Sequence, residues 1–438
     1  MKQKLSLTNR IWIGFTLFSM FFGAGNLIFP PFLGYQAGRS LWKGFAGFLM
    51  SAVLFPLLGV AAVALAGGLD KLAGRIHPKF ATIFSLLIYL SIGPCLAIPR
   101  TAGTSYEMAV LPLFGKVLGE NTQFVYMLLF FGAAWLISLK PERISDWLGK
   151  MMTPCLLVLI ILIFVGCIFW PVGQWAEPSA LYQENPVSSG FLAGYQTMDT
   201  MAALNFGIVI ALNIQAKGVK HERSVMRETV YAGLLAGLLL ALVYGVLVYI
   251  GSIAGTGVSQ AENGTAILTW VVNELYGTNG LRILAVLFFI SCFNVCVGLI
   301  CCCSEYFSRL VVRIPYKLWT LLFSVVSLGI ANVGLNRILV LSLPVIHALY
   351  PVAIVLISLA FVHPWIKHVP LVYPYCVLTT ALASTAESIL PSLGENHALN
   401  LLLEHIPGYG HGFGWLLPAL FGAAAGAAVS AFSASGKQ

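Results

Sequence analysis

The stretch FGAGNLIFPP, from Phe22 to Pro31, interrupts the first long apolar segment of this chain, residues 11–32. A helix needs about 20 apolar residues to cross a bilayer, so the segment is long enough to span one. Because lipid offers no partners to free backbone groups, two glycines and an asparagine near mid-depth indicate a binding site. We expect Pro30 and Pro31 to end this helix. The binding residues predicted at the break are Gly23, Ala24, Gly25 and Asn26.

The composition around this stretch identifies the class of protein. Of 438 residues, 59% are hydrophobic and only 9% are charged, whereas soluble proteins contain about 25% charged residues. We therefore predict an all-α polytopic membrane protein that has the lipid bilayer as its surroundings. The twelve predicted transmembrane helices cover residues 11–32, 44–66, 80–112, 123–139, 151–170, 190–213, 229–253, 282–304, 318–333, 339–361, 371–390 and 413–433.

The distribution of basic residues predicts the orientation in the membrane. The formal net charge is +8, and most lysines and arginines fall in alternate loops, such as those containing Lys2, Arg75, Arg143, Arg227 and Arg309. Such loops face the cytoplasm. We expect a multi-pass protein of the cell membrane with cytoplasmic N- and C-termini. Topology accounts for the basic charge, so no nucleic-acid partner is expected, and the sequence leaves the oligomeric state open.

A second interrupted segment lies in residues 190–213, where Thr197-Met198-Asp199-Thr200 precedes Asn205-Phe206-Gly207. Interrupted helices at matching positions of two halves indicate an inverted-repeat transporter with its site near mid-membrane. An odd number of helices per half gives the halves opposite orientations, so we predict a 5+5 inverted repeat plus two C-terminal helices. The predicted units are residues 1–170, 171–361 and 362–438.

The interrupted segments supply groups that suit a zwitterion or an ion. An unwound helix exposes N–H donors at its positive end, which suit a carboxylate, and free carbonyls, which suit a cation. Asn26 adds an amide oxygen. A packing kink closed by Asn26 and Pro30 is the alternative.

Asp199 is the most informative charge, because a carboxylate within a membrane helix is costly and usually has a partner or a task. Contact with an ion or the substrate, capping of a half-helix and proton relay all remain open. Asn205 and Phe206 complete the predicted substrate-binding set with Asp199 and the first break. Arg100 is a second buried charge, either structural or part of a gate, and Glu107 lies two turns away on the same face as a possible ion-pair partner.

Signatures of other functions are missing. No HExxH, GxSxG or phosphate-binding loop occurs in the sequence. The chain is therefore predicted not to be an enzyme, and sparse intramembrane charges argue against a channel. His347, the one histidine well inside a predicted helix, is most simply a satisfied interior residue.

The stretch from Phe22 to Pro31 resembles the bacterial branched-chain amino acid carrier (BrnQ, LIVCS) family when taken with four further motifs. These are Pro99-Arg100-Thr101, Thr197-Met198-Asp199-Thr200, Val297-Gly298-Leu299 and Glu305. The resemblance implies a symporter that imports leucine, isoleucine and valine, usually with Na⁺. It also implies similarity to LeuT-type transporters, with their five-plus-five repeat. A proton-coupled carrier or an exchanger of related amino acids is the alternative; a channel or membrane-embedded enzyme is a more distant one.

The resemblance also assigns residues. It places the substrate carboxylate at the amides near Ala24 and Gly25, and directs carbonyls around Ser19 and Phe22 toward an ion site completed by residues 282–304. Family members typically carry threonine before Val297, where this chain has Ser291-Cys292-Phe293-Asn294-Val295-Cys296. Asn294 can supply an amide oxygen instead, so Ser19, Phe22 and Asn294 are the expected Na⁺ residues, and protons are the other candidate coupling ion. No further cofactor is expected.

Overall fold

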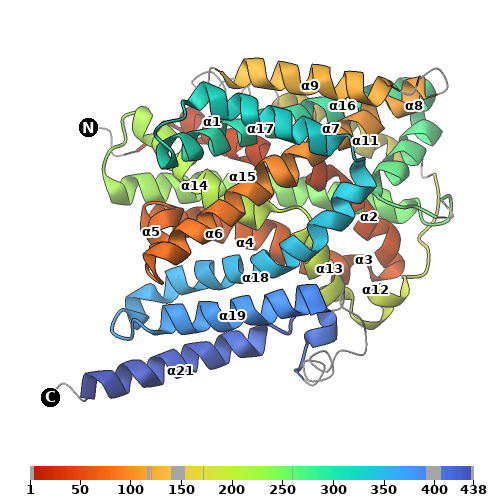
Figure 1. The fold of residues 1–438 in the computed structure, drawn as a ribbon. Coiled ribbons are helices and arrows are strands. Elements are labelled where there is room, and N and C mark those ends of the chain that lie inside the picture. Colours follow the sequence, from red (N-terminus) through yellow and green to blue (C-terminus); the bar gives the residue numbers. More distant parts are fainter. Residues whose placement is uncertain are drawn as a thin grey trace.

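The computed structural model describes residues 4–115, 119, 121–139, 153–170, 172–258, 260–390 and 406–435. These residues form helices and connecting turns, and none of them belongs to a β-strand, which confirms the all-α prediction for this part of the chain. The helices run mostly side by side across the view in Figure 1. Lys2 and Arg143, which were used to predict the topology, lie outside the described residues.

The helices of the first half of the chain are α1 (Leu7–Phe21), α2 (Ala24–Ala37), α3 (Leu41–Leu49), α4 (Phe55–Ala66), α5 (Leu69–Gly74), α6 (Pro78–Leu90), α7 (Ala97–Ala109), α8 (Leu111–Phe114), α9 (Thr122–Ser138) and α11 (Thr153–Phe169). Those of the second half are α12 (Ala180–Glu184), α13 (Pro186–Tyr195), α14 (Asp199–Ala216), α15 (Glu222–Ile253), α16 (Gly264–Leu310), α17 (Tyr316–Ala331), α18 (Leu335–Ile366), α19 (Val372–Ile389) and α21 (Leu416–Ser435).

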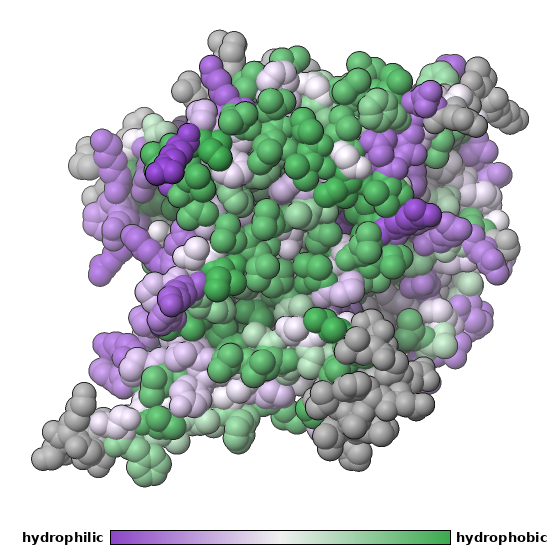
Figure 2. Space-filling model, in the orientation of Figure 1, coloured by the Kyte–Doolittle hydropathy of each residue, from purple (hydrophilic) through white to green (hydrophobic). Residues whose placement is uncertain are grey.

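An apolar surface surrounds the helical bundle. Figure 2 shows hydrophobic residues across the middle of the molecule and hydrophilic residues gathered toward the two ends of the helices. Large apolar side chains are exposed on this surface, among them Leu129, Leu238, Leu341 and Leu382. Seven helical segments of the described chain are long and apolar enough to cross a membrane. These features confirm a membrane protein, while the count of twelve spans stays a prediction.

Both predicted helix interruptions are present. α1 ends at Phe21 and α2 begins at Ala24, so the first break lies where the sequence indicated. α13 ends at Tyr195 and α14 begins at Asp199. The second break is shorter than the polar segment that predicted it, because Asn205 and Phe206 lie within the regular turns of α14.

The prediction that Pro30 and Pro31 end the first segment is wrong. α2 continues through both prolines to Ala37. Close packing against α15 holds this region, because a Cβ atom at Gly251 of α15 would lie 1.9 Å from the carbonyl oxygen of Pro31. Neighbouring helices in a membrane protein can compensate for the hydrogen bond that a proline removes, and here a glycine lets such a neighbour approach.

Two further helices complete the surroundings of the breaks. The predicted third span is divided into α6 and α7 by a π-helical segment, Ser91–Cys95, in which Gly93 has non-helical torsion angles. α7 carries Arg100 and packs along α16. α16 is itself kinked at Gly277, and its later part contains the predicted eighth span. The two breaks, α7 and α16 therefore meet around one region.

Candidate substrate and ion site

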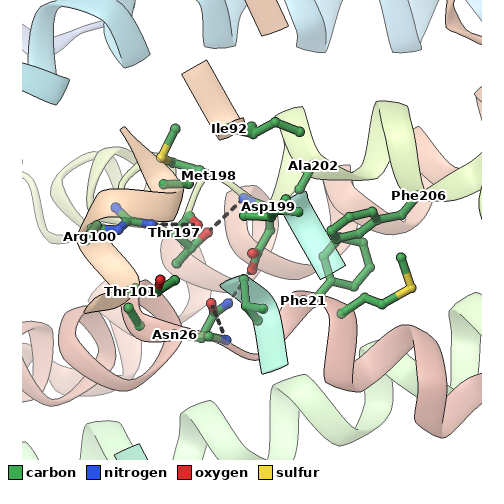
Figure 3. Close-up of a pocket in the computed structure, with 17 residues that line it drawn as sticks. Phe21, Asn26, Ile92, Arg100, Thr101, Thr197, Met198, Asp199, Ala202 and Phe206 are labelled. Carbon is green, nitrogen blue, oxygen red and sulfur yellow. Dashed lines mark hydrogen bonds between the residues drawn. The ribbon is translucent and has the colours of Figure 1, made fainter. Parts of the chain in front are cut away.

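A cavity lies between the two helix breaks, and Figure 3 shows its lining. α1 and α2 contribute one wall, and α7, α14 and α16 contribute the others. The free space is only about 30 Å³, enough for a water molecule or two. An amino acid therefore requires side chains or helices to move apart as it enters. The lining residues are Met20, Phe21, Gly23, Ala24, Gly25, Asn26, Ile92, Ala97, Arg100, Thr101, Thr197, Met198, Asp199, Ala202, Phe206, Val295 and Leu299.

The first break presents backbone donors to this cavity. Gly23 is extended, with φ −127° and ψ −155°, and α2 begins immediately after it. The Gly23 N–H donates to Oδ1 of Asn26 at 3.1 Å. The first N–H groups of any helix lack intrahelical acceptors and carry the positive end of its dipole. The amides of Ala24 and Gly25 belong to this first turn, so the break is suited to an anion.

The second break presents acceptors instead. Met198 adopts the left-handed conformation with φ 65°, which turns the chain between α13 and α14. The Thr197 hydroxyl donates to the carbonyl of Gly194 at 2.9 Å. The carbonyls of Gln196 and Thr197 both accept hydrogen bonds from Arg100, and Asp199 follows directly. This break therefore concentrates negative partial charge and one carboxylate.

Asp199 links the two breaks. Its Oδ2 accepts from Nδ2 of Asn26 at 2.6 Å and from the hydroxyl of Tyr244 at 3.0 Å. Asn26 and Tyr244 also contact each other, which joins α2, α14 and α15 in one buried network. Asp199 is only 2% exposed. Because its carboxylate contacts two other helices, a role limited to capping α14 does not account for the geometry.

Arg100 reaches from α7 to the second break. Its Nη1 donates to the carbonyl of Gln196 at 2.7 Å, and Nη2 donates to that of Thr197 at 3.4 Å. The guanidinium lies over the Phe29 ring, 5.6 Å from its centroid. The expected pair with Glu107 is absent from the described residues, because Glu107 instead faces Thr265 of α16, whose hydroxyl is 3.5 Å from Oε2.

The residues expected at an ion site lie together beside the first break. Nδ2 of Asn294 donates to the Ser19 hydroxyl at 2.8 Å, and the Ser291 hydroxyl donates to the carbonyl of Phe22 at 2.9 Å. All of these groups are buried. Val295 faces Gly23 closely, since a Cβ at Gly23 would lie 2.8 Å from Cγ2 of Val295. The Phe22 carbonyl and the Ser19 and Ser291 hydroxyls supply oxygen atoms here, which suit a hard cation, whereas Asn294 presents its amide nitrogen to Ser19.

Residues 6–433 match a protein family described as branched-chain amino acid transport protein. The chain belongs to this family. It is 37% identical to the branched-chain amino acid permease BraB of Bacillus subtilis, covering 100% of this chain and 99% of the relative. It is 36% identical to the permease BrnQ of Escherichia coli K12, with 95% and 94% covered. The resemblance seen in the motifs is confirmed, and the protein is a transporter rather than an enzyme.

Solved structures show the same fold for this transporter. The nucleobase-cation-symport-1 family transporter Mhp1, with bromovinylhydantoin bound, has a TM-score of 0.63 at 11% identity, covering 97% of this chain and 93% of that one. MhsT in complex with L-phenylalanine has a TM-score of 0.59 at 16% identity, with 99% and 100% covered. At such low identity the likeness concerns the fold alone.

The structure of this transporter separates two predicted substrate residues. Phe206 lines the cavity and packs edge-on against Phe21, with ring centroids 5.4 Å apart. Asn205 is buried on α14 but does not line the cavity, and its amide has no hydrogen-bond partner among the described residues. Successive residues of a helix point about 100° apart, and on α14 Phe206 faces the cavity while Asn205 is turned away from it. Asn205 therefore lies outside the lining of this cavity, and its role in substrate binding stays a prediction.

Sequence reasoning missed Tyr244 and Ser291, which contact predicted residues from α15 and α16. Their only signal is a hydroxyl within an apolar segment, which many membrane helices share. His347 lies away from the site. It lines a second cavity of mostly apolar character together with Phe29 and Gln196, and it meets the Tyr195 ring edge-on at 6.0 Å.

Proposed function

We propose that this transporter imports leucine, isoleucine and valine across the cell membrane by symport with a cation, and that Na⁺ is the coupling ion. One observation carries the proposal: a break that offers N–H donors and a break that offers carbonyls and a carboxylate face one buried cavity. These two sets of groups complement the carboxylate and the ammonium of an amino acid.

The architecture that we propose has twelve transmembrane helices, with five and five in inverted repeats and two more at the C-terminal end. Breaks at α1–α2 and α13–α14 support it, because they occupy the leading helix of each proposed half. With both termini in the cytoplasm, the halves have opposite orientations. Transport then alternates access to the cavity by movement of one set of helices against the other.

Apolar side chains support a preference for aliphatic substrates. Phe21, Phe206, Met20, Ile92 and Leu299 line the cavity next to the polar groups of the breaks. An apolar pocket distinguishes one methylene by only about 1–3 kcal/mol. Leucine, isoleucine and valine therefore compete for the same site.

For the coupling ion, the Phe22 carbonyl and the hydroxyls of Ser19 and Ser291 favour Na⁺, and Asn294 would have to turn its amide oxygen inward to join them. One observation favours a second candidate, the proton. Asp199 is buried, and its hydrogen-bond donors Asn26 and Tyr244 are neutral. A buried carboxylate whose hydrogen-bond donors are all neutral is stabilised further by a bound cation or by protonation. In a proton-coupled carrier, Asp199 would bind and release the coupled proton.

Uptake of labelled isoleucine into proteoliposomes tests the function. Na⁺ and pH gradients are imposed separately, and a third set of vesicles contains unlabelled leucine with neither gradient. Accumulation with Na⁺ alone supports sodium symport, and accumulation with pH alone supports the proton. Uptake that requires internal leucine and neither gradient identifies an exchanger. Absence of accumulation under both gradients contradicts symport.

A further inference from the structure

We infer that Arg100 is a direct ligand of the substrate carboxylate and completes an anion site with the first turn of α2. The inference rests on the proposed function, because it takes an amino acid as the substrate. Arg100 comes from α7, outside both helix breaks, and none of the hydrogen bonds described above gives it an anionic partner. The site would take α-amino acids and reject analogues without a carboxylate.

One edge of the Arg100 guanidinium is already occupied. Nη1 and Nη2 point at the carbonyls of Gln196 and Thr197, at 2.7 and 3.4 Å. The Phe29 ring covers one face of the planar group. These contacts fix the position of the guanidinium before a ligand arrives, so little side-chain entropy is lost on binding.

The other edge is free and buried. Nε has no hydrogen-bond partner among the described residues, although Arg100 is only 4% exposed. Nε–H and one N–H of Nη2 share this edge, and Nη2 lies so close to Gly25 that a Cβ there would be 2.8 Å away. A buried donor without an acceptor destabilises the folded protein. A carboxylate that accepts from both nitrogens removes this cost and forms the strong bidentate arrangement.

Electrostatics point to the same ligand. The positive end of the α2 dipole and the guanidinium converge at Gly25, and two positive groups repel each other unless an anion lies between them. Within the described residues, Arg100 forms no ion pair with a carboxylate. Asp199 lines the same cavity and attracts Arg100 electrostatically, but its carboxylate accepts hydrogen bonds from Asn26 and Tyr244 rather than from the guanidinium. A substrate carboxylate would place an anion within hydrogen-bonding reach of the free edge of Arg100 and of the first turn of α2.

The alternative is that Arg100 serves only as a structural link between α7 and the second break. The two roles differ in what they predict for the ligand. A structural link affects the binding of every ligand equally, whether or not it carries a carboxylate. If Arg100 binds the substrate carboxylate, replacing it weakens the binding of leucine. The binding of leucinamide, which has an uncharged amide in place of the carboxylate, stays nearly unchanged.

The test measures binding of leucine and leucinamide to purified full-length protein, by competition with labelled isoleucine and by ligand-induced thermal stabilisation. The variants are R100Q, R100K and, as a matched control, R39Q. Arg39 forms an ion pair with Glu177 on the exposed surface. A pH of about 6.5 keeps the amines of both ligands protonated.

We expect the wild type to prefer leucine over leucinamide. R100Q should bind leucine about 10- to 100-fold more weakly, because a charged hydrogen-bond pair contributes about 1.5–3 kcal/mol, and bind leucinamide within about threefold of wild type. R100K keeps the charge without the planar fork, so its preference should lie between those of R100Q and the wild type. R39Q should match the wild type.

Equal losses for both ligands in R100Q and R100K would overturn the inference in favour of a structural link. A leucine preference unchanged in R100Q would overturn it as well. If R100Q melts far below the wild type, R100K decides, since it retains the charge. A wild-type protein that binds neither leucine nor isoleucine overturns the proposed function itself, which distinguishes that failure from a failure of the role of Arg100.

Discussion

The two helix breaks that face the cavity are built in opposite ways. The break at Gly23 depends on missing side chains, because Val295 and Arg100 approach the backbone where a Cβ would be at Gly23 and Gly25. The break at Met198 contains no glycine and turns through a left-handed, non-glycine residue. One break presents amide donors and the other presents carbonyls and a carboxylate.

This contrast assigns different tasks to the two breaks. The first offers its backbone N–H groups to an anion, because the Asn26 side chain is already bonded to Asp199, and it requires close approach of the ligand and of Arg100. The second acts through Asp199, whose charge reaches both the first break and α15. Substitutions at the first break should therefore weaken substrate affinity. Substitutions at the second should disturb coupling to the cation or the stability of the turn.

Asp199→Asn should have the largest effect. The amide keeps the size of the side chain and removes the charge that a coupling cation or proton requires, so accumulation of isoleucine against its gradient should be lost. Uptake into proteoliposomes with imposed gradients, together with counterflow without gradients, measures this directly. Counterflow that survives while accumulation is lost would locate the defect in coupling.

Glu177→Gln is the matched control, because Glu177 forms an exposed ion pair with Arg39 and does not line the cavity. It should accumulate isoleucine as the wild type does. Normal accumulation by Asp199→Asn would contradict the contrast between the breaks and reduce Asp199 to a helix-capping residue.

Gly25→Ala should have the second-largest effect, a loss of leucine affinity of at least about tenfold. The new Cβ would lie 2.8 Å from Nη2 of Arg100 and 3.3 Å from the Phe29 ring, so the guanidinium must shift and the carboxylate site is displaced. A misplaced charged hydrogen bond costs about 1.5–3 kcal/mol. Leucine binding to the purified variant measures the change.

Gly132→Ala on α9 provides the control for this substitution, because no atom lies within 4 Å of a Cβ built there. It should bind leucine as the wild type does. If Gly25→Ala also retained wild-type affinity, close approach to the first break would not be needed, and the backbone role assigned to it would be wrong.

The sequence predicted where the helices break but not what the breaks contact. Gly23 and Asp199 were identified because polar and small residues interrupt an apolar helix, a signal that is local in sequence. The contacts of Asp199 with Tyr244, and of Phe22 with Ser291, depend on how separate helices rotate and pack. A hydroxyl in an apolar helix does not show which neighbour it will face.

Two differences between expectation and structure, at Glu107 and at Asn205, have the same origin. Helical spacing correctly placed Arg100 and Glu107 on one face of α7, yet that face meets two different neighbours: the second break at Arg100 and α16 at Glu107. Asn205 was assigned by its proximity in sequence to Phe206, although adjacent helical residues point in different directions. Local spacing defines a face, while only packing defines its partner.

Ser291→Ala tests whether the first break also contributes to the proposed ion site. The Ser291 hydroxyl donates to the carbonyl of Phe22 at the end of α1, beside the first break. If this hydroxyl contributes about 0.5–1.5 kcal/mol to Na⁺ binding, its loss should raise the Na⁺ concentration for half-maximal uptake by roughly two- to tenfold. Leucine affinity at saturating Na⁺ should stay unchanged.

The measurement is the Na⁺ dependence of initial uptake rates, with Thr320→Ala as a control. Thr320 is also a buried hydroxyl that bonds a backbone carbonyl, but it lies on α17, which does not line the cavity. An unchanged Na⁺ dependence in Ser291→Ala would remove this cluster of oxygens as the ion site and direct attention to Asp199.

Met198→Ile should have the smallest effect, and it concerns the stability of the second break rather than transport. A β-branched residue is strongly disfavoured at φ 65°, which Met198 adopts, so isoleucine should destabilise the turn by about 1–3 kcal/mol. Met198→Leu is the control, because it keeps a buried side chain of similar size without branching at Cβ. Thermal unfolding in detergent should give a lower melting temperature for isoleucine than for leucine. Equal melting temperatures would contradict a left-handed conformation at position 198.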